Sequence, residues 1–189
     1  PNNPSYLNDH KIFGRILVPG MAYIETALAA VADRNPGSVS RLHNVSFEQP
    51  MVLEGNDSRK VQTIVNPSAQ ATSNFAICSR SGGSHDSDEA WIQHVTGQLS
   101  SAEKDDCDFE PLSVDKARND CSNLLVTHDE LYKKLRADGF ELGPMFQALQ
   151  TVWLGADQSL GYVKLPAEEE GELGKYRLHP LLLDACLTA

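Results

Sequence analysis

The feature that most constrains this chain is residues 20–31 (GMAYIETALAAV), a stretch with almost no polar face. Only Glu25 and Thr26 are strongly polar. Apolar residues recur at three- and four-residue steps, namely at Met21, Ile24, Leu28 and Val31. A helix that is apolar on all sides must be covered by other structure. The sequence therefore predicts a buried helix with Met21, Ile24 and Leu28 almost inaccessible to water.

A histidine and the start of this helix lie close together in the sequence. Pro19 suits a first helical turn, because the N–H that proline lacks would have no partner there. The N–H groups of Gly20 and Met21 are then free to meet an acceptor, and His10 titrates near neutrality. These residues indicate a site, although a hydrogen-bonded structural histidine fits the same pattern equally well.

Composition excludes several classes of protein. The chain has 189 residues, 41% of them hydrophobic, which is enough for one large or two small globular domains. A net charge of −10 and the absence of a basic run argue against nucleic-acid binding. The sequence has neither a membrane-spanning apolar stretch nor a signal-peptide core. Widely spaced cysteines predict free thiols in a reducing compartment, although spacing alone leaves disulfides open, at Cys78, Cys107, Cys121 and Cys186.

The pattern along the chain predicts an α+β fold with antiparallel strands. Strands are expected at 40–47, 60–66, 71–80 and 89–99, with a hairpin loop at 81–88 between the last two. The later part predicts a capped helix from Thr127 to Gly139, strands at 148–154 and 159–165, a loop at 167–174 and a final apolar helix. We expect a first half at 1–100, an acidic linker at 101–125 and a second half at 126–189. Because an uncapped apolar helix ends the chain, the second half is expected to be incomplete.

Three short motifs occur in order. His10, Gly14 and Pro19 fit HxxxGxxxxP, residues 139–147 (GFELGPMFQ) resemble GYxYGPxFQ, and residues 179–184 (HPLLLD) resemble HPxxLD. Together they resemble the dehydratase domain of a modular polyketide synthase, over essentially the whole chain. The resemblance implies a double hot-dog fold, in which an antiparallel sheet wraps a buried helix in each half, with strands missing at both ends.

The chemistry explains the residue types. Removing water from a 3-hydroxyacyl thioester needs a base for the proton beside the carbonyl and an acid for the departing hydroxyl. His10, with an ordinary pKa of about 6.5, suits the base. Asp184 suits the acid if its apolar surroundings raise its pKa. By resemblance, the Gly20 N–H binds the enolate oxygen. The alternative for Asp184 is an aspartate that only favours the helix dipole.

The resemblance implies further motif or substrate-lining residues, although the Gly-Pro turn is equally consistent with a structural role. They are Gly14, Pro19, Leu142, Gly143, Pro144, Phe146, Gln147, His179, Pro180 and Thr188. Two positions depart from the family. Thr188 replaces a Gln or His that would bond the aspartate, and Leu142 replaces a tyrosine. These departures favour an alternative function, an inactive module that scaffolds a synthase dimer.

The remaining expectations concern cofactors and partners. No metal or redox cofactor is implied, and a solvated or strand-face role is expected for the ungrouped histidines, His43, His85, His94 and His128. Cys186 is expected to pack in the core. By resemblance, the substrate is a phosphopantetheine thioester on an acyl carrier protein, beside neighbouring synthase domains in a cytoplasmic homodimer. Cyclisation and double-bond shift are the enzymatic alternatives, and Pro19 with Asp184 favours dehydration.

Overall fold

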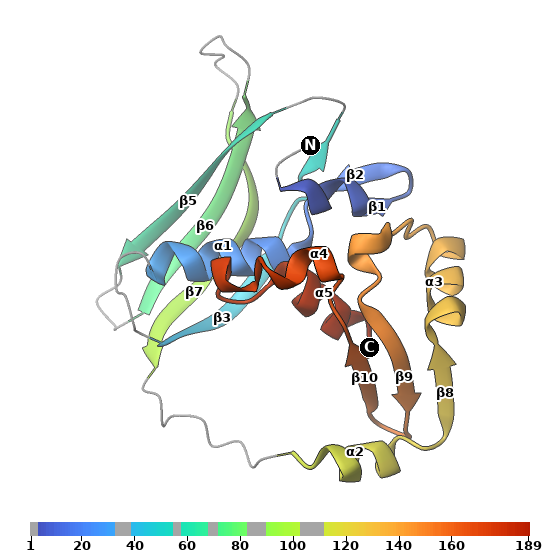
Figure 1. The fold of residues 1–189 in the computed structure, drawn as a ribbon. Helices are drawn as coiled ribbons and strands as arrows, with labels where there is room; N and C mark the ends of the chain where they lie inside the picture. Colours follow the sequence, from blue (N-terminus) through green and yellow to red (C-terminus); the bar gives the residue numbers. More distant parts are fainter. Residues whose placement is uncertain (1–3, 33–38, 55–57, 68–71, 83–89, 103–111) are drawn as a thin grey trace.

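The computed structural model describes residues 4–32, 39–54, 58–67, 72–82, 90–102 and 112–189. Most of the hairpin loop expected at 81–88, with His85, and also Cys107 lie outside the described residues. The described chain forms three antiparallel sheets, and helices lie against the two larger ones (Figure 1). We refer to residues 4–102 as the first half and residues 112–189 as the second half.

The first half is a four-stranded antiparallel sheet that curves around one helix (Figure 1). The strand order is β3-β7-β6-β5, and the helix is α1. Their bounds are Gly20–Ala32 for α1, Val39–Phe47 for β3, Arg59–Pro67 for β5, Thr72–Ser81 for β6 and Ile92–Ala102 for β7. Alternate residues of β6 and β7 fill the space beneath the helix, among them Ile77 and Val95, both fully buried. The helix and the four strands predicted from the sequence are thus confirmed.

The buried face of α1 differs from the predicted one. Tyr23 and Ala27 are 5% and 0% exposed, whereas Met21, Ile24 and Leu28 are only partly buried. The Tyr23 ring stacks on His94 of the sheet. The prediction was wrong because a helix that is apolar on all sides has no polar stripe to reveal which face is covered.

A small sheet that the sequence did not predict is formed by two strands before α1 and one strand after β3. Its order is β1-β2-β4, and a 3-10 helix, η1, leads into it. The bounds are Ser5–Asp9 for η1, Lys11–Ile12 for β1, Arg15–Leu17 for β2 and Val52–Leu53 for β4. The turn between β1 and β2 places Gly14 at φ +72°, a conformation that glycine adopts without strain. This motif glycine therefore serves the turn that follows His10.

The second half contains a three-stranded antiparallel sheet of order β10-β9-β8 (Figure 1). Its strands are β8 at Leu124–Thr127, β9 at Leu149–Leu154 and β10 at Ser159–Val163. The helices are α2 at Val114–Asp120, α3 at His128–Ala137, η2 at Pro144–Phe146, α4 at Ala167–Glu170, η3 at Leu173–Lys175 and α5 at Pro180–Thr188. As predicted, a capping box starts α3, because the Thr127 N–H donates to the Glu130 carboxylate at 3.0 Å.

Two segments without predicted structure contain helices. The range expected to be a linker, 101–125, contains α2, whose first turn is capped by the Ser113 hydroxyl, and the start of β8. The range expected to be a loop, 167–174, contains α4, built from Glu-rich sequence with a high helix propensity. Short helices of this kind carry too few residues for an apolar period to be visible.

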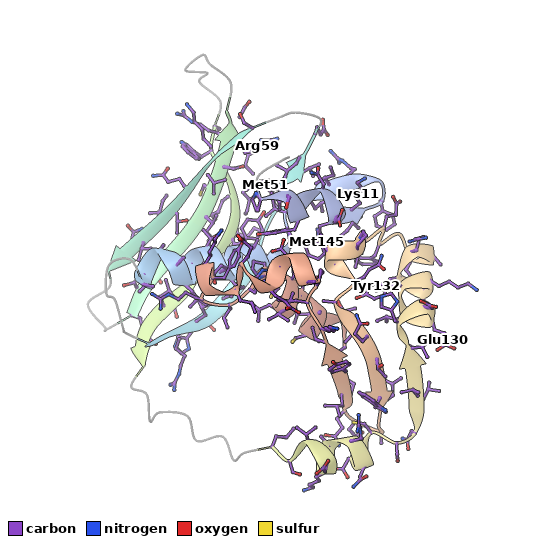
Figure 2. The ribbon with its side chains drawn as sticks, in the orientation of Figure 1. Lys11, Met51, Arg59, Glu130, Tyr132 and Met145 are labelled. Carbon is purple, nitrogen blue, oxygen red and sulfur yellow. The ribbon has the colours of Figure 1, made fainter. Side chains whose placement is uncertain are left out.

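The two halves share one hydrophobic core. Buried residues of both halves form a single cluster, and α5 packs against α1 as well as against β9 and β10. Met51 of the first half and Tyr132 of the second belong to this cluster (Figure 2). Among the helices of the described ranges, none is long and apolar enough to cross a membrane.

Candidate active site

His10 lies between η1 and β1 and is 8% exposed. Its Nδ1 is 2.9 Å from the carbonyl oxygen of Leu17. Because a carbonyl only accepts, Nδ1 of the neutral ring carries the proton and Nε2 is left as the basic nitrogen. The Phe146 ring packs on the imidazole at a centroid distance of 4.8 Å. The histidine is therefore held in one tautomer and one orientation.

The Gly-Pro turn lies beside this histidine through contacts with Asp9. The Gly143 N–H donates to the Asp9 carbonyl oxygen at 2.8 Å, and the Met145 N–H donates to Asp9 Oδ2 at 3.0 Å. A side chain at Gly143 would collide with the Asp9 carboxyl, which explains the glycine. The turn formed by η2 thus fixes Phe146 against His10.

The other residues of the turn have structural contacts. Gln147 Nε2 donates to the Leu142 carbonyl oxygen at 2.7 Å. Leu142 is 8% exposed and belongs to the hydrophobic core, whereas Pro144 is exposed. Gln147 therefore closes the turn upon itself, and the residue that replaces the family's tyrosine is part of the core.

The third motif forms the start of α5. His179 is 4% exposed, and its Nδ1 accepts the Leu181 N–H at 3.3 Å, so it caps the helix that begins at Pro180. The His179 Nε2 lies 3.3 Å from Glu169 Oε2 without hydrogen-bonding geometry. These two motif residues therefore shape the first turn of the helix that carries Asp184.

Asp184 is partly buried in α5. Burial raises the pKa of its carboxyl above the ordinary value, and the positive charge of His10 acts in the opposite direction. The first and third motifs are thus electrostatically coupled, although they lie near opposite ends of the chain. In the described part of the chain the carboxylate has no hydrogen bond, and the Thr188 hydroxyl donates instead to the Asp184 backbone carbonyl oxygen at 3.0 Å. Thr188 therefore does not orient the carboxyl group.

Gly20 is the first residue of α1, and the buried Pro19 precedes it. A Cβ at Gly20 would lie 3.3 Å from the Phe47 ring, so the backbone approaches this side chain closely. Among the described residues, the first amide of the helix with a backbone acceptor is that of Ala22, which donates to Pro19 O at 3.0 Å. Within the described ranges the Gly20 N–H has no backbone acceptor, and its role as a donor to the enolate oxygen stays a prediction.

Sequence reasoning missed Tyr132 of α3. Its hydroxyl donates to the Phe146 carbonyl oxygen at 3.2 Å and accepts the Leu149 N–H at 3.2 Å. Burial raises the pKa of Tyr132, and the charge of Asp184 adds to this increase. Tyr132 lies beside Leu131 and Leu135 on an otherwise charged helix, and this pattern could have indicated that its side chain is buried. The pattern could not have indicated its contact with the turn that contains Phe146.

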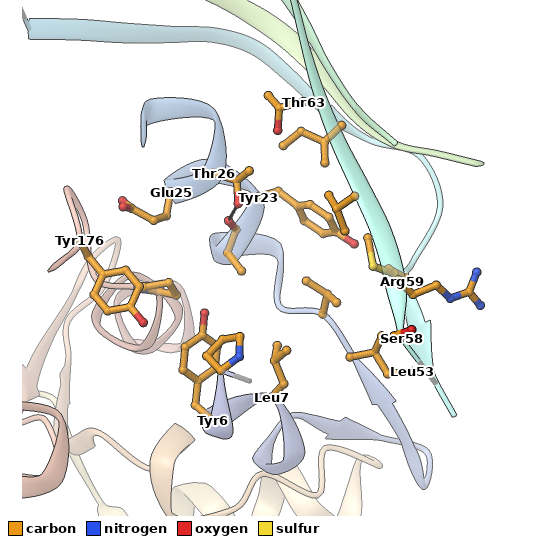
Figure 3. A pocket seen from close by; sticks show the side chains of 17 residues that line it. Tyr6, Leu7, Tyr23, Glu25, Thr26, Leu53, Ser58, Arg59, Thr63 and Tyr176 are labelled. Atoms are coloured by element: carbon orange, nitrogen blue, oxygen red, sulfur yellow. Dashed lines mark hydrogen bonds between the residues drawn. The ribbon is translucent and has the colours of Figure 1, made fainter. Parts of the chain in front are cut away.

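A cavity of about 900 Å³ lies between α1, η1 and β5 (Figure 3). Tyr6, Tyr23 and Glu25 line it, and so does Arg59 at its β5 side (Figure 3). Burial raises the pKa of Tyr23 to about 12, so its phenol is neutral at physiological pH. His10 and Asp184 are not among the lining residues, and a cavity shared by these two stays a prediction.

Comparisons with known proteins identify the family of this chain. A model of the polyketide synthase dehydratase domain matches residues 1–80, and one of the polyketide synthase dehydratase N-terminal domain matches residues 109–189. The chain belongs to the polyketide synthase dehydratase family. It is 32% identical over 185 residues to polyketide synthase GfsB of Streptomyces halstedii and 29% identical over 189 residues to PksN of Bacillus subtilis. These alignments cover 96% and 97% of this chain, but only 3% of each relative.

Solved dehydratase structures have the same fold. The dehydratase domain from the CurK module of curacin polyketide synthase superposes with a TM-score of 0.86 at 27% identity, over 99% of this chain and 63% of that chain. Two inactive CurK dehydratase mutants also match, one with an aspartate changed to asparagine and one with a histidine changed to phenylalanine. The predicted α+β double hot-dog fold is thereby confirmed, and this chain spans part of it.

Other sequence-based expectations have mixed outcomes. His94 lies on β7, in agreement with the expected strand-face role, but it is 2% exposed, with Ser79 Oγ 2.7 Å from its Nε2 and the Gln49 carbonyl oxygen 2.9 Å from its Nδ1. Cys186 is exposed, contrary to prediction, because Leu181 and Ala185 form the buried side of α5. The described cysteines are free thiols, as predicted, at Cys78, Cys121 and Cys186.

Proposed function

We propose that this chain carries the catalytic groups of a dehydratase that converts a 3-hydroxyacyl thioester to the 2,3-enoyl thioester. The observation that carries the proposal is the pairing of an ordered, buried His10 with Asp184, a carboxyl that burial makes less acidic. In CurK, changing one aspartate or one histidine gives inactive mutants, and those two positions are separated by nearly the same number of residues as Asp184 and His10.

In this mechanism His10 is the general base. Its Nε2 removes a proton from the carbon beside the thioester carbonyl, because Nδ1 is already committed to the Leu17 carbonyl oxygen. The electron pair of the broken C–H bond moves toward the carbonyl, and negative charge develops on its oxygen. The Gly20 N–H at the positive end of α1 donates to that oxygen.

Asp184 is the general acid. A carboxyl group with a raised pKa retains its proton at higher pH, so it can protonate the hydroxyl that leaves as water. The C–O bond breaks while the carbon–carbon double bond forms. The proton taken up by His10 then replaces the one that Asp184 lost. No other group is required to balance the reaction.

The proposed partners come from the family. The relatives are polyketide synthases, which supports an acyl chain held as a phosphopantetheine thioester on an acyl carrier protein, and neighbouring synthase domains. A homodimeric synthase in the cytoplasm and a division into halves at 1–100 and 126–189, joined through 101–125, belong to the same proposal.

A mass measurement on the full-length protein tests the proposed activity. A 3-hydroxyacyl thioester on an acyl carrier protein is incubated with the wild type and with His10→Phe, and the acyl group is weighed after release. Loss of one water with the wild type alone supports dehydration. An unchanged mass with both proteins supports the scaffold alternative, which Leu142 in the core and the backbone contact of Thr188 favour.

A further inference from the structure

Glu25 is a buried carboxylate in the middle of α1, 8% exposed. Its Oε1 accepts the Arg177 N–H at 2.9 Å, and its Oε2 accepts the Leu178 N–H at 2.8 Å. Each oxygen therefore binds one backbone amide of the second half. Burial of a carboxylate is costly unless such bonds compensate it, and hydrogen bonds to a charged acceptor are short and strong.

No cationic side chain competes for this carboxylate in the described part of the chain. Burial raises the pKa values of the Tyr6 and Tyr176 phenols, and the charges of Glu169 and Glu25 add to this increase. Figure 3 shows Glu25 and Tyr176 at the same side of the cavity. The two amides are thus the groups that hold the Glu25 carboxylate in place.

The amides that Glu25 binds lie directly before α5. His179 follows Leu178 and caps the helix, and Pro180 is its first residue. Proline has a fixed φ and the cap fixes the first turn, so little freedom remains between the bound amides and the helix. Asp184 lies in the next turn of the same helix. The Glu25 contact therefore fixes the start of α5 against α1, while the rest of the helix also packs against β9 and β10.

We propose that Glu25 is a positioning residue, which fixes α5 through the Arg177 and Leu178 amides and so places Asp184 relative to His10. The proposal rests on the proposed function, because the placement matters for dehydration. It assigns Glu25 no contact with the substrate. Its effect is geometric, since small displacements of a reacting group cost large factors in rate.

Glu25→Gln is the test variant. Glutamine has the same shape but only one acceptor oxygen, so one of the two amides must face an N–H₂ group and lose its bond. We expect kcat for dehydration by the full-length protein to fall about 10- to 100-fold with KM little changed. Hydrogen exchange at the Arg177 and Leu178 amides should become faster. Glu172→Gln is the matched control, because it removes an exposed carboxylate of the same segment that pairs with Lys175.

A readout that does not need turnover separates this proposal from the proposed function. The titration of the Asp184 carboxyl group is followed by carbon-13 NMR. Displacement of α5 in Glu25→Gln should admit water to this group and lower the midpoint pH of its titration. If the wild type does not dehydrate the thioester, the proposed function fails, while amide exchange and the midpoint still decide whether Glu25 positions Asp184.

An unchanged kcat together with an unchanged Asp184 midpoint would overturn the proposal, even if the protein were less stable. If Glu25→Gln does not fold, Glu25→Asp is measured in the same way. Aspartate keeps the charge but is one methylene shorter, so it reaches the amides poorly. A folded Glu25→Asp with wild-type kcat and midpoint would also contradict the proposal.

Discussion

The helices α1 and α5 have similar apolar compositions but hold their acidic residues in opposite ways. Each begins at or directly after a proline, is mostly apolar and carries one carboxylate within its first two turns, Glu25 in α1 and Asp184 in α5. Glu25 accepts two backbone N–H groups. The Asp184 carboxylate accepts no hydrogen bond within the described ranges, and burial raises its pKa.

This difference shows how surroundings, and not residue type, divide two carboxylates between roles. The two hydrogen bonds from the Arg177 and Leu178 amides hold the Glu25 carboxylate in one place, which makes it a fixed structural acceptor. Desolvation without such bonds stabilises the protonated form and makes Asp184 a proton donor. The positive charge of His10 limits how far the Asp184 pKa rises, which keeps the acid able to release its proton.

The largest expected effect comes from removing the proton of Asp184. Asp184→Asn keeps the shape of the side chain but cannot release a proton, so the dehydration rate should fall by about 10² to 10⁴. The rate of water loss, followed by mass, is the measurement. Asp157→Asn, which changes an exposed acid of the second half, is the control. A near-normal rate for Asp184→Asn would mean that this carboxylate is as structural as Glu25.

Alanine substitutions in the cores beneath the two helices should lower the free energy of unfolding by similar amounts. Ile77 of the first sheet and Leu149 of the second are both fully buried, so replacing either with alanine should destabilise the protein by about 2–5 kcal/mol. Leu28→Ala should cost less, roughly 1 kcal/mol, because Leu28 is partly exposed. Denaturant unfolding measures all three. If Leu28→Ala and Ile77→Ala lost the same free energy of unfolding, the outer face of α1 would be covered in solution.

The desolvated Asp184 carboxyl should also lower the stability of the protein at neutral pH. Its folded pKa lies above its unfolded value, so its favourable contribution is complete below about pH 4 and is lost as the pH rises through the folded pKa. Asp184→Asn should therefore melt at a higher temperature than the wild type at pH 7, and the gap should close on acidification. A wild type that is more stable at pH 7 would contradict the desolvated setting.

The smallest expected effect concerns Thr188. Its hydroxyl bonds the Asp184 backbone, so a longer side chain that reaches the carboxyl should hold the acid better. Thr188→Gln should raise the rate roughly two- to tenfold, the equivalent of one hydrogen bond. Thr188→Val, which cannot bond the carboxyl, should give no gain. If both variants match the wild type, another group already orients Asp184.

Much of the fold could be predicted because α1 and the strands of the first sheet are long enough to show their period. The first and third motifs also singled out His10 and Asp184, whose charges interact in the structure, but their roles as base and acid stay predictions. The short strands β1, β2 and β4 could not be predicted, since two or three residues show no alternation. Asp9 and Glu25 accept hydrogen bonds from backbone amides, and because every residue except proline has such an amide, the donor's residue type does not reveal the contact.

The most direct test of the contrast between the two carboxylates is the titration of Asp184 itself. Carbon-13 NMR of labelled aspartate, with Asp184→Asn to identify the resonance, gives the midpoint in the wild type and in His10→Gln. The midpoint should lie above the ordinary aspartate value of about 3.9 and should rise further without the histidine charge. A midpoint at or below the ordinary value that does not respond to His10→Gln would contradict both the desolvation of Asp184 and its interaction with His10.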